Sequence, residues 1–156
     1  MASIRNDRDL RRSLSKLPEI EQRIIGARFA GSVARWSREE RIQRAIATGV
    51  EREASPDALE DAYRAAKSYA TKTYTDCGKD TDWLSQADHF VAAAIAAALT
   101  PSSLLSDKQN RAWKAAVQAR MAVNCAMMED QEGDEADFAN ETERQYLLVN
   151  EHLNSD

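Results

Sequence analysis

The sequence predicts an all-α fold, a compact bundle of about six helices with a buried, alanine-rich central helix. The 156 residues include only five glycines and three prolines, and β-branched residues never gather into the alternating runs that are typical of strands. Residues 90–99 form an uninterrupted apolar run that is mostly alanine. A chain of this length can fold as a single helical domain, residues 1–156, and bury roughly 70% of the surface that its unfolded form exposes.

The first predicted helix covers residues 18–36 and follows residues 1–14, a candidate irregular segment. Pro18 can occupy a first helical turn, where its missing N–H costs nothing. Apolar residues then recur at three- and four-residue steps: Ile20, Ile24, Ile25, Phe29, Val33 and Trp36. A second helix is predicted next, because Ser37 and Glu40 have the spacing of a capping box and Gly49 can end the helix.

The third predicted helix has the clearest start signal in the chain. Ser55, Pro56 and Asp57 combine an N-cap, a first-turn proline and a carboxylate at the positive end of the helix dipole. This helix should reach about Tyr74, where a polar turn follows.

The fourth helix is the predicted centre of the bundle. Thr81 or Asp82 can cap its start, and Thr100-Pro101 ends it. Residues 90–99 are apolar on every face, and a helix that is apolar all round is buried. Alanine side chains also let neighbouring helices approach closely.

The last two helices are separated by an acidic connector, residues 129–137. Ser106 and Gln109 have the spacing of a second capping box, which predicts a fifth helix that continues through Ala126. The last helix should end near Leu153.

Charge is distributed unevenly along the chain, whose net charge is −5. Residues 1–50 contain eleven basic and six acidic side chains, whereas residues 100–156 contain five and eleven. One alternative function is therefore a nucleic-acid-associated regulator that uses the arginine-rich opening helices, with Arg28, Arg35 and Arg41 as contacts. A pI near 5.2 opposes non-specific phosphate binding, so we do not expect a nucleic-acid partner.

We expect a cytoplasmic protein with no membrane association. The apolar run at 90–99 is about half the length that spans a bilayer, and the charged residues near the amino terminus have no apolar stretch behind them. Cys77 and Cys125 do not form a closely spaced pair, so we predict neither a disulfide framework nor a zinc knuckle.

A second alternative is an enzyme or metal protein that uses His89 and Cys77. With Asp80 and Asp82, these side chains fall within thirteen residues, and a turn followed by a helix could bring them together. The chain lacks Glu-x-x-His, His-Glu-x-x-His and Walker-type motifs. A lone histidine near the start of a buried helix is more often structural, and free cysteine packs as a small hydrophobe. We therefore predict no catalytic residue, no cofactor and no metal.

The predicted partner-binding residues are the carboxylates of the connector: Glu129, Asp130, Glu132, Asp134, Glu135 and Asp137. They do not form an EF-hand, because counting back from Gly133 places Met128 at the first loop position. Two structural roles stay open, a solvated linker and favourable charge at the start of the last helix. The functional interpretation is an anionic patch for a basic partner.

Several segments carry a resemblance to a known family: residues 25–35 (IGARFAGSVAR), 41–46 (RIQRAI), 62–66 (AYRAA), the alanine block before Pro101, and 143–145 (ERQ). Their order resembles that in a family of alanine-rich, helical immunity proteins found beside bacterial polymorphic toxins. The resemblance implies a small cytoplasmic bacterial protein that binds and neutralises a cognate toxin, and it assigns no interface residues. An acidic inhibitor suits a basic target such as a nuclease. We therefore expect a non-enzymatic protein-binding domain whose contact surface is the acidic connector.

Overall fold

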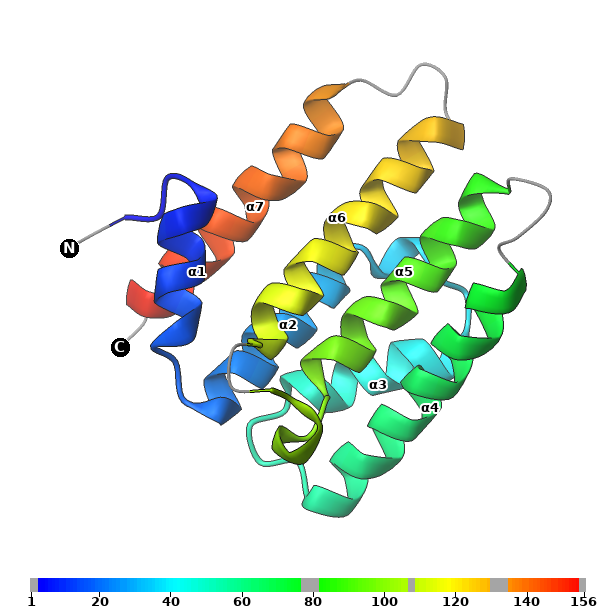
Figure 1. Ribbon diagram of the computed structural model, residues 1–156, viewed down its shortest axis with the longest axis horizontal. Helices are drawn as coiled ribbons and strands as arrows, with labels where there is room; N and C mark the ends of the chain where they lie inside the picture. Colours follow the sequence, from blue (N-terminus) through cyan, green and yellow to red (C-terminus); the bar gives the residue numbers. More distant parts are fainter. Residues whose placement is uncertain (1–2, 77–81, 107–108, 130–134, 155–156) are drawn as a thin grey trace.

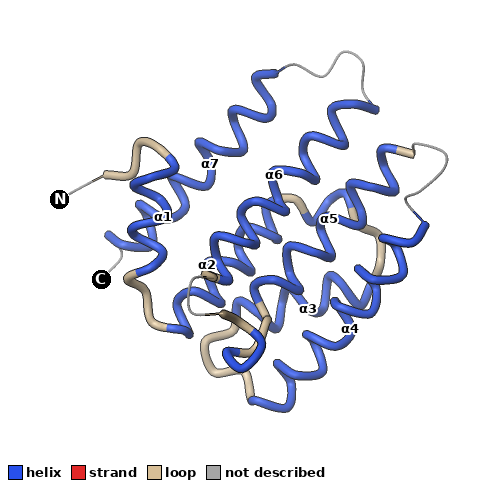
Figure 2. Tube along the Cα trace, in the orientation of Figure 1, coloured by secondary structure: helices blue, strands red, loops and turns tan. Residues whose placement is uncertain are grey.

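The computed structural model describes residues 3–76, 82–106, 109–129 and 135–154, with side chains except at 75–76, 129 and 135–140. All regular structure in these ranges is helical, which confirms the predicted all-α fold (Figure 2). The elements, in chain order, are α1 (Asp7–Ser15), α2 (Glu19–Ser32), the 3₁₀ turn η1 (Ala34–Trp36), α3 (Glu40–Val50), α4 (Pro56–Asp76), α5 (Trp83–Ala98), the 3₁₀ turn η2 (Ser102–Leu104), α6 (Arg111–Glu129) and α7 (Glu135–Asn154).

The helices form two layers (Figure 1). In one layer, α4, α5, α6 and α7 lie side by side, and in the other α2 and α3 pack behind α4, α5 and α6. Helix α1 crosses the end of the first layer and contacts α6. None of the described helices is both long and apolar enough to cross a membrane.

Helix α5 is the predicted central helix and packs against α2, α3, α4 and α6. Nine of its sixteen residues are buried, so its burial is confirmed. Small residues on α2 and α3 allow the close approach. A Cβ on Gly26 would lie 2.8 Å from the Cβ of Ala98, and one on Gly49 would lie 2.8 Å from the Cβ of Ala27.

Gly49 therefore has a different role from the predicted one. Helix α3 continues to Val50, and no glycine among the described residues has a positive φ. Gly49 is buried inside the helix because α2 passes too close for a side chain. It is a packing residue, and not a helix end.

Two predicted helix starts are confirmed. The Ser55 hydroxyl accepts a hydrogen bond from the backbone N–H of Ala58 at 3.1 Å. The Asp82 carboxylate accepts from the backbone N–H groups of Leu84 and Ser85 at 3.2 and 3.3 Å.

The prediction of a capping box at Ser37 is wrong. Helix α3 begins at Glu40, its N-cap is Glu39, and no side chain caps it. Ser37 is buried, and its hydroxyl accepts only from the N–H of Glu39 at 3.4 Å. Because the extended backbone after η1 delays the helix by two residues, the serine no longer reaches the free N–H groups of the first turn.

The capping box at Ser106 forms only in part. The Ser106 N–H donates to the Gln109 side chain at 3.1 Å, as predicted. Helix α6 nevertheless begins later, at Arg111, where Asn110 accepts from the N–H of Trp113 at 3.0 Å.

Residues 1–14 were predicted to be an irregular segment, but α1 covers Asp7–Ser15. Helix α1 is capped by Asn6, and it buries Leu10 and Leu14 completely. Asp7 then joins it to two distant helices, through an ion pair with Arg120 at 2.8 Å and a hydrogen bond from Tyr146 at 2.8 Å. So short a helix depends on such tertiary contacts.

Candidate functional site

The acidic connector, predicted as the contact surface, joins α6 to α7. Asp130, Glu132 and Asp134 lie outside the described residues, and the side chains of Glu129, Glu135 and Asp137 are not described. The end of α6 and the start of α7 lie at the same end of the bundle as the end of α4 and the start of α5 (Figure 1). Partner binding by this segment stays a prediction.

His89 has a structural environment on α5. It is 8% exposed, and its Nδ1 lies 2.8 Å from the Thr73 hydroxyl of α4. The rings of Tyr74 and Phe90 pack around it, with centroids 5.8 and 5.0 Å away. Burial lowers the pKa of His89, which favours the neutral imidazole at pH 7.

Asp82 is the one other member of the predicted cluster that the structure describes, and its hydrogen bonds are to residues other than His89. Hydrogen bonds from the Ser85 hydroxyl and from backbone N–H groups occupy the Asp82 carboxylate and lower its pKa. Cys77 and Asp80 lie outside the described residues. Among the described side chains, no group of three His, Cys, Asp or Glu residues could hold a metal ion. Cys125 is buried beside α5, with its Sγ 3.9 Å from the Gln86 side-chain oxygen.

The three arginines of the nucleic-acid alternative have different surroundings. Arg35 stacks over the Trp36 ring at 3.8 Å and donates to the Ser32 carbonyl. Arg41 forms an ion pair with Glu39 at 2.8 Å. Arg28 is exposed. Two of the three guanidiniums are thus held by neighbours on their own segment.

An open groove of about 500 Å³ lies over α5, between α4 and α6. We call it the α5 groove. It is lined by Tyr63, Lys67, Ala70, Thr71 and Tyr74 of α4, by His89, Phe90, Ala93, Ala96, Ala97 and Thr100 of α5 and its end, and by Lys114 and Gln118 of α6.

The α5 groove follows from the alanines of the central helix. Methyl groups at the floor do not fill the space between α4 and α6, so Phe90 and Ala93 stay half-buried. Tyr74 stands at the rim and is 72% exposed. Lys67 of α4 and Lys114 of α6 both line the groove, and neither forms an ion pair with a described residue.

This groove was not predicted, although part of its signal is present in the sequence. Tyr63, Lys67 and Tyr74 stand at helical spacing on one face of α4. Two tyrosines on an otherwise solvated face would have marked that face as a candidate contact surface. The α6 side has no comparable local signal, because Lys114 and Gln118 are ordinary surface residues.

Comparison with known protein families, with curated proteins and with solved structures finds no match to this chain. Its function is therefore argued from its residues and their geometry.

Proposed function

We propose that this chain is a non-enzymatic protein-binding domain. The observation that carries the proposal is the α5 groove, an apolar concave surface with an exposed tyrosine at its rim and a lysine on each side. Tyrosine supplies a large contact area at low entropic cost and is common in binding surfaces. The two lysines favour an acidic or amide-rich segment of the partner.

The polar side chains that catalysis could use have structural partners instead. His89 bonds to Thr73 across the α4–α5 contact, and Asp82 caps α5. Glu141 is fully buried, where it accepts from the Ser32 hydroxyl at 2.7 Å and pairs with Arg144 at 2.9 Å. These contacts support a binding role over catalysis, because each group already has a structural partner.

The more specific form of the proposal is an immunity protein that neutralises a cognate toxin, as the sequence resemblance implies. In that case the acidic connector would face a basic surface of the toxin, while the α5 groove would receive one of its projecting segments. The two surfaces carry opposite charge, so together they would orient a partner as well as attract it.

The experiment is affinity capture from a lysate of the organism that encodes the chain, using four forms of the protein. One variant neutralises Asp130, Glu132, Asp134 and Glu135, and a second carries Lys67→Glu and Lys114→Glu in the groove. A matched control neutralises four exposed carboxylates at the other end of the bundle: Glu51, Glu53, Asp57 and Asp61.

We expect one stoichiometric protein partner that wild type and the control retain. Loss of this partner from the groove variant supports the groove, and loss from the connector variant supports the connector. Recovery of nucleic acid in place of protein, in amounts that fall with salt, would favour the regulator. A partner that all four forms retain equally would refute both surfaces.

A further inference from the structure

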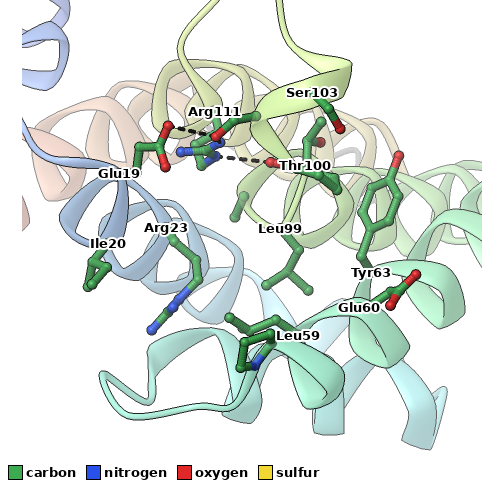
Figure 3. A pocket seen from close by; sticks show the side chains of 14 residues that line it. Glu19, Ile20, Arg23, Leu59, Glu60, Tyr63, Leu99, Thr100, Ser103 and Arg111 are labelled. Atoms are coloured by element: carbon green, nitrogen blue, oxygen red, sulfur yellow. Dashed lines mark hydrogen bonds between the residues drawn. The ribbon is translucent and has the colours of Figure 1, made fainter.

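A second pocket lies beside the α5 groove, at the carboxyl-terminal end of α5. It has a volume of about 490 Å³ and is enclosed by the start of α2, the start of α4, the turn after α5 and the first residue of α6 (Figure 3). It adjoins the groove at Tyr63 and Thr100, which line both. We call it the arginine pocket, because Arg23 and Arg111 line it.

Both guanidiniums are almost completely buried. Arg111 is 5% exposed and Arg23 is 9% exposed. Arg111 donates through Nε to the Thr100 carbonyl and through Nη2 to the Ser102 hydroxyl, both at 3.1 Å. Arg23 donates to the carbonyls of Gly49, at 3.1 Å, and Glu51. Each arginine thus satisfies carbonyl groups at the end of a helix.

These contacts leave part of each guanidinium unused. Neither arginine forms an ion pair within the described part of the chain. The Nη1 atoms of Arg23 and Arg111 have no hydrogen bond to a described residue. Arginine carries five N–H donors in a planar fork that fits a carboxylate, so each side chain keeps donors for a ligand.

The electrostatics of the pocket also favour an anion. Burial lowers the pKa of Arg23, and the neighbouring charges of Arg52 and Arg111 lower it further. Burial likewise lowers the pKa of Arg111, with a partial offset from Glu19. Buried cations without a paired anion are costly. An anion bound in the pocket would relieve part of that cost.

The rest of the pocket limits the kind of anion. Leu59 and Tyr63 rise from α4 and face Leu99 at the end of α5 (Figure 3), which makes one side apolar. Glu19 and Glu60 are exposed lining residues. These carboxylates would repel a doubly charged head group more strongly than a singly charged one. The volume lies within the range of small-molecule sites, roughly 300–1,000 Å³.

We infer that the arginine pocket binds a small organic carboxylate with an apolar body. The carboxylate accepts hydrogen bonds from the free donors of Arg111 and Arg23, and the apolar body packs against Leu59, Tyr63 and Leu99. This site goes beyond the proposed protein-binding function and needs no protein partner.

The test is a calorimetric titration of the full chain with hexanoate and octanoate, using hexanamide and octanamide as neutral matches. The Nε–H resonances of the arginine side chains report the location of binding. We expect saturable binding of at least one acid, with shifts at Arg23 and Arg111, and at least about tenfold weaker binding of its amide.

Three variants locate the site. Arg111→Gln should abolish binding, but it also removes a hydrogen bond that holds the end of α5. Ser103→Trp keeps both guanidiniums and fills the pocket from η2, and it should abolish binding while the circular dichroism spectrum stays unchanged. The control is Arg28→Gln, an exposed arginine outside the pocket, which should bind like wild type.

Three outcomes would overturn the inference. They are no saturable binding of either acid, equal binding of an acid and its amide, and unchanged acid binding in a folded Ser103→Trp protein. None of them depends on the capture experiment, so the protein-binding proposal can fail while this one holds, or the reverse.

Discussion

The α5 groove and the arginine pocket adjoin at Tyr63, but their positive charges have different surroundings. Lys67 and Lys114 line the sides of the groove, whose floor is mostly alanine, and neither forms an ion pair with a described residue. Arg23 and Arg111 are buried, and they hold the carbonyl ends of α3 and α5. An open charge can be changed at little structural cost, whereas a buried one is part of the fold.

The largest expected difference is between two alanines of α5. Ala98 is fully buried against Gly26, whereas Ala93 is half-buried at the groove floor. Ala98→Leu should lower the free energy of unfolding by about 3 kcal/mol, because the core cannot take the added volume. Ala93→Leu should change it by less than about 0.5 kcal/mol. Urea unfolding measures both, and equal effects would mean that the groove floor is packed as tightly as the core.

A pair of charge removals compares the two cavities directly. Arg111→Met should cost about 2 kcal/mol of unfolding free energy, because the Thr100 carbonyl and the Ser102 hydroxyl lose a charged donor. Lys114→Met should stay within about 0.5 kcal/mol. Chemical denaturation followed at 222 nm distinguishes them, with Arg28→Met as an exposed control. If Lys114→Met lowered the unfolding free energy as much as Arg111→Met, Lys114 would be as important to the fold as Arg111, which would contradict the difference between the two cavities.

The pH dependence of stability tests the histidine beneath the groove. Burial lowers the pKa of His89 and outweighs a hydrogen bond to the Ala70 backbone and the charge of Asp88. The unfolded chain therefore takes up a proton near pH 6.5, before the folded protein does. Stability should be fully present above that pH and should fall as the pH is lowered from about 7 toward 5.

The control for this prediction is His89→Gln. In this variant, the free energy of unfolding should fall less steeply between pH 7 and pH 5 than in wild type, whatever its value at pH 7. Thermal unfolding at half-unit pH steps measures both curves. Parallel curves for the two proteins would show that another group causes the decline.

The smallest expected effect on stability is at the groove rim. Tyr74 is largely exposed and packs only at the edge of His89, so Tyr74→Ser should change the unfolding free energy by less than about 0.5 kcal/mol. If Tyr74 anchors a partner, the same change should weaken binding by about 2 kcal/mol, or roughly thirtyfold. Unchanged affinity for a captured partner would remove Tyr74 from the contact surface.

The sequence correctly predicted the start of those helices whose N-cap residue lies at the helix start itself. Ser55 and Asp82 cap α4 and α5 as their side chains and positions indicated, because an N-cap acts within three residues. The burial of most of α5 was equally readable, because a helix that is apolar on every face is typically buried.

The same local reasoning failed where a distant element decides the outcome. Ser37 has a correct capping-box spacing, but η1 moves the start of α3. Helix α1 is too short to be stable alone, and Asp7 joins it to α6 and α7. Gly49 does not end α3; it is a glycine because α2 packs closely against it.

The sequence by itself determined that the chain is helical, where α4 and α5 begin and which helix lies at the centre. These properties depend on residues within one or two turns of each other. Only the tertiary structure decided that Lys67 and Lys114 line one groove and that Arg23 and Arg111 line one pocket. Each cavity needs side chains from helices far apart in the chain. Such pairings depend on how whole helix faces pack, which no local pattern encodes.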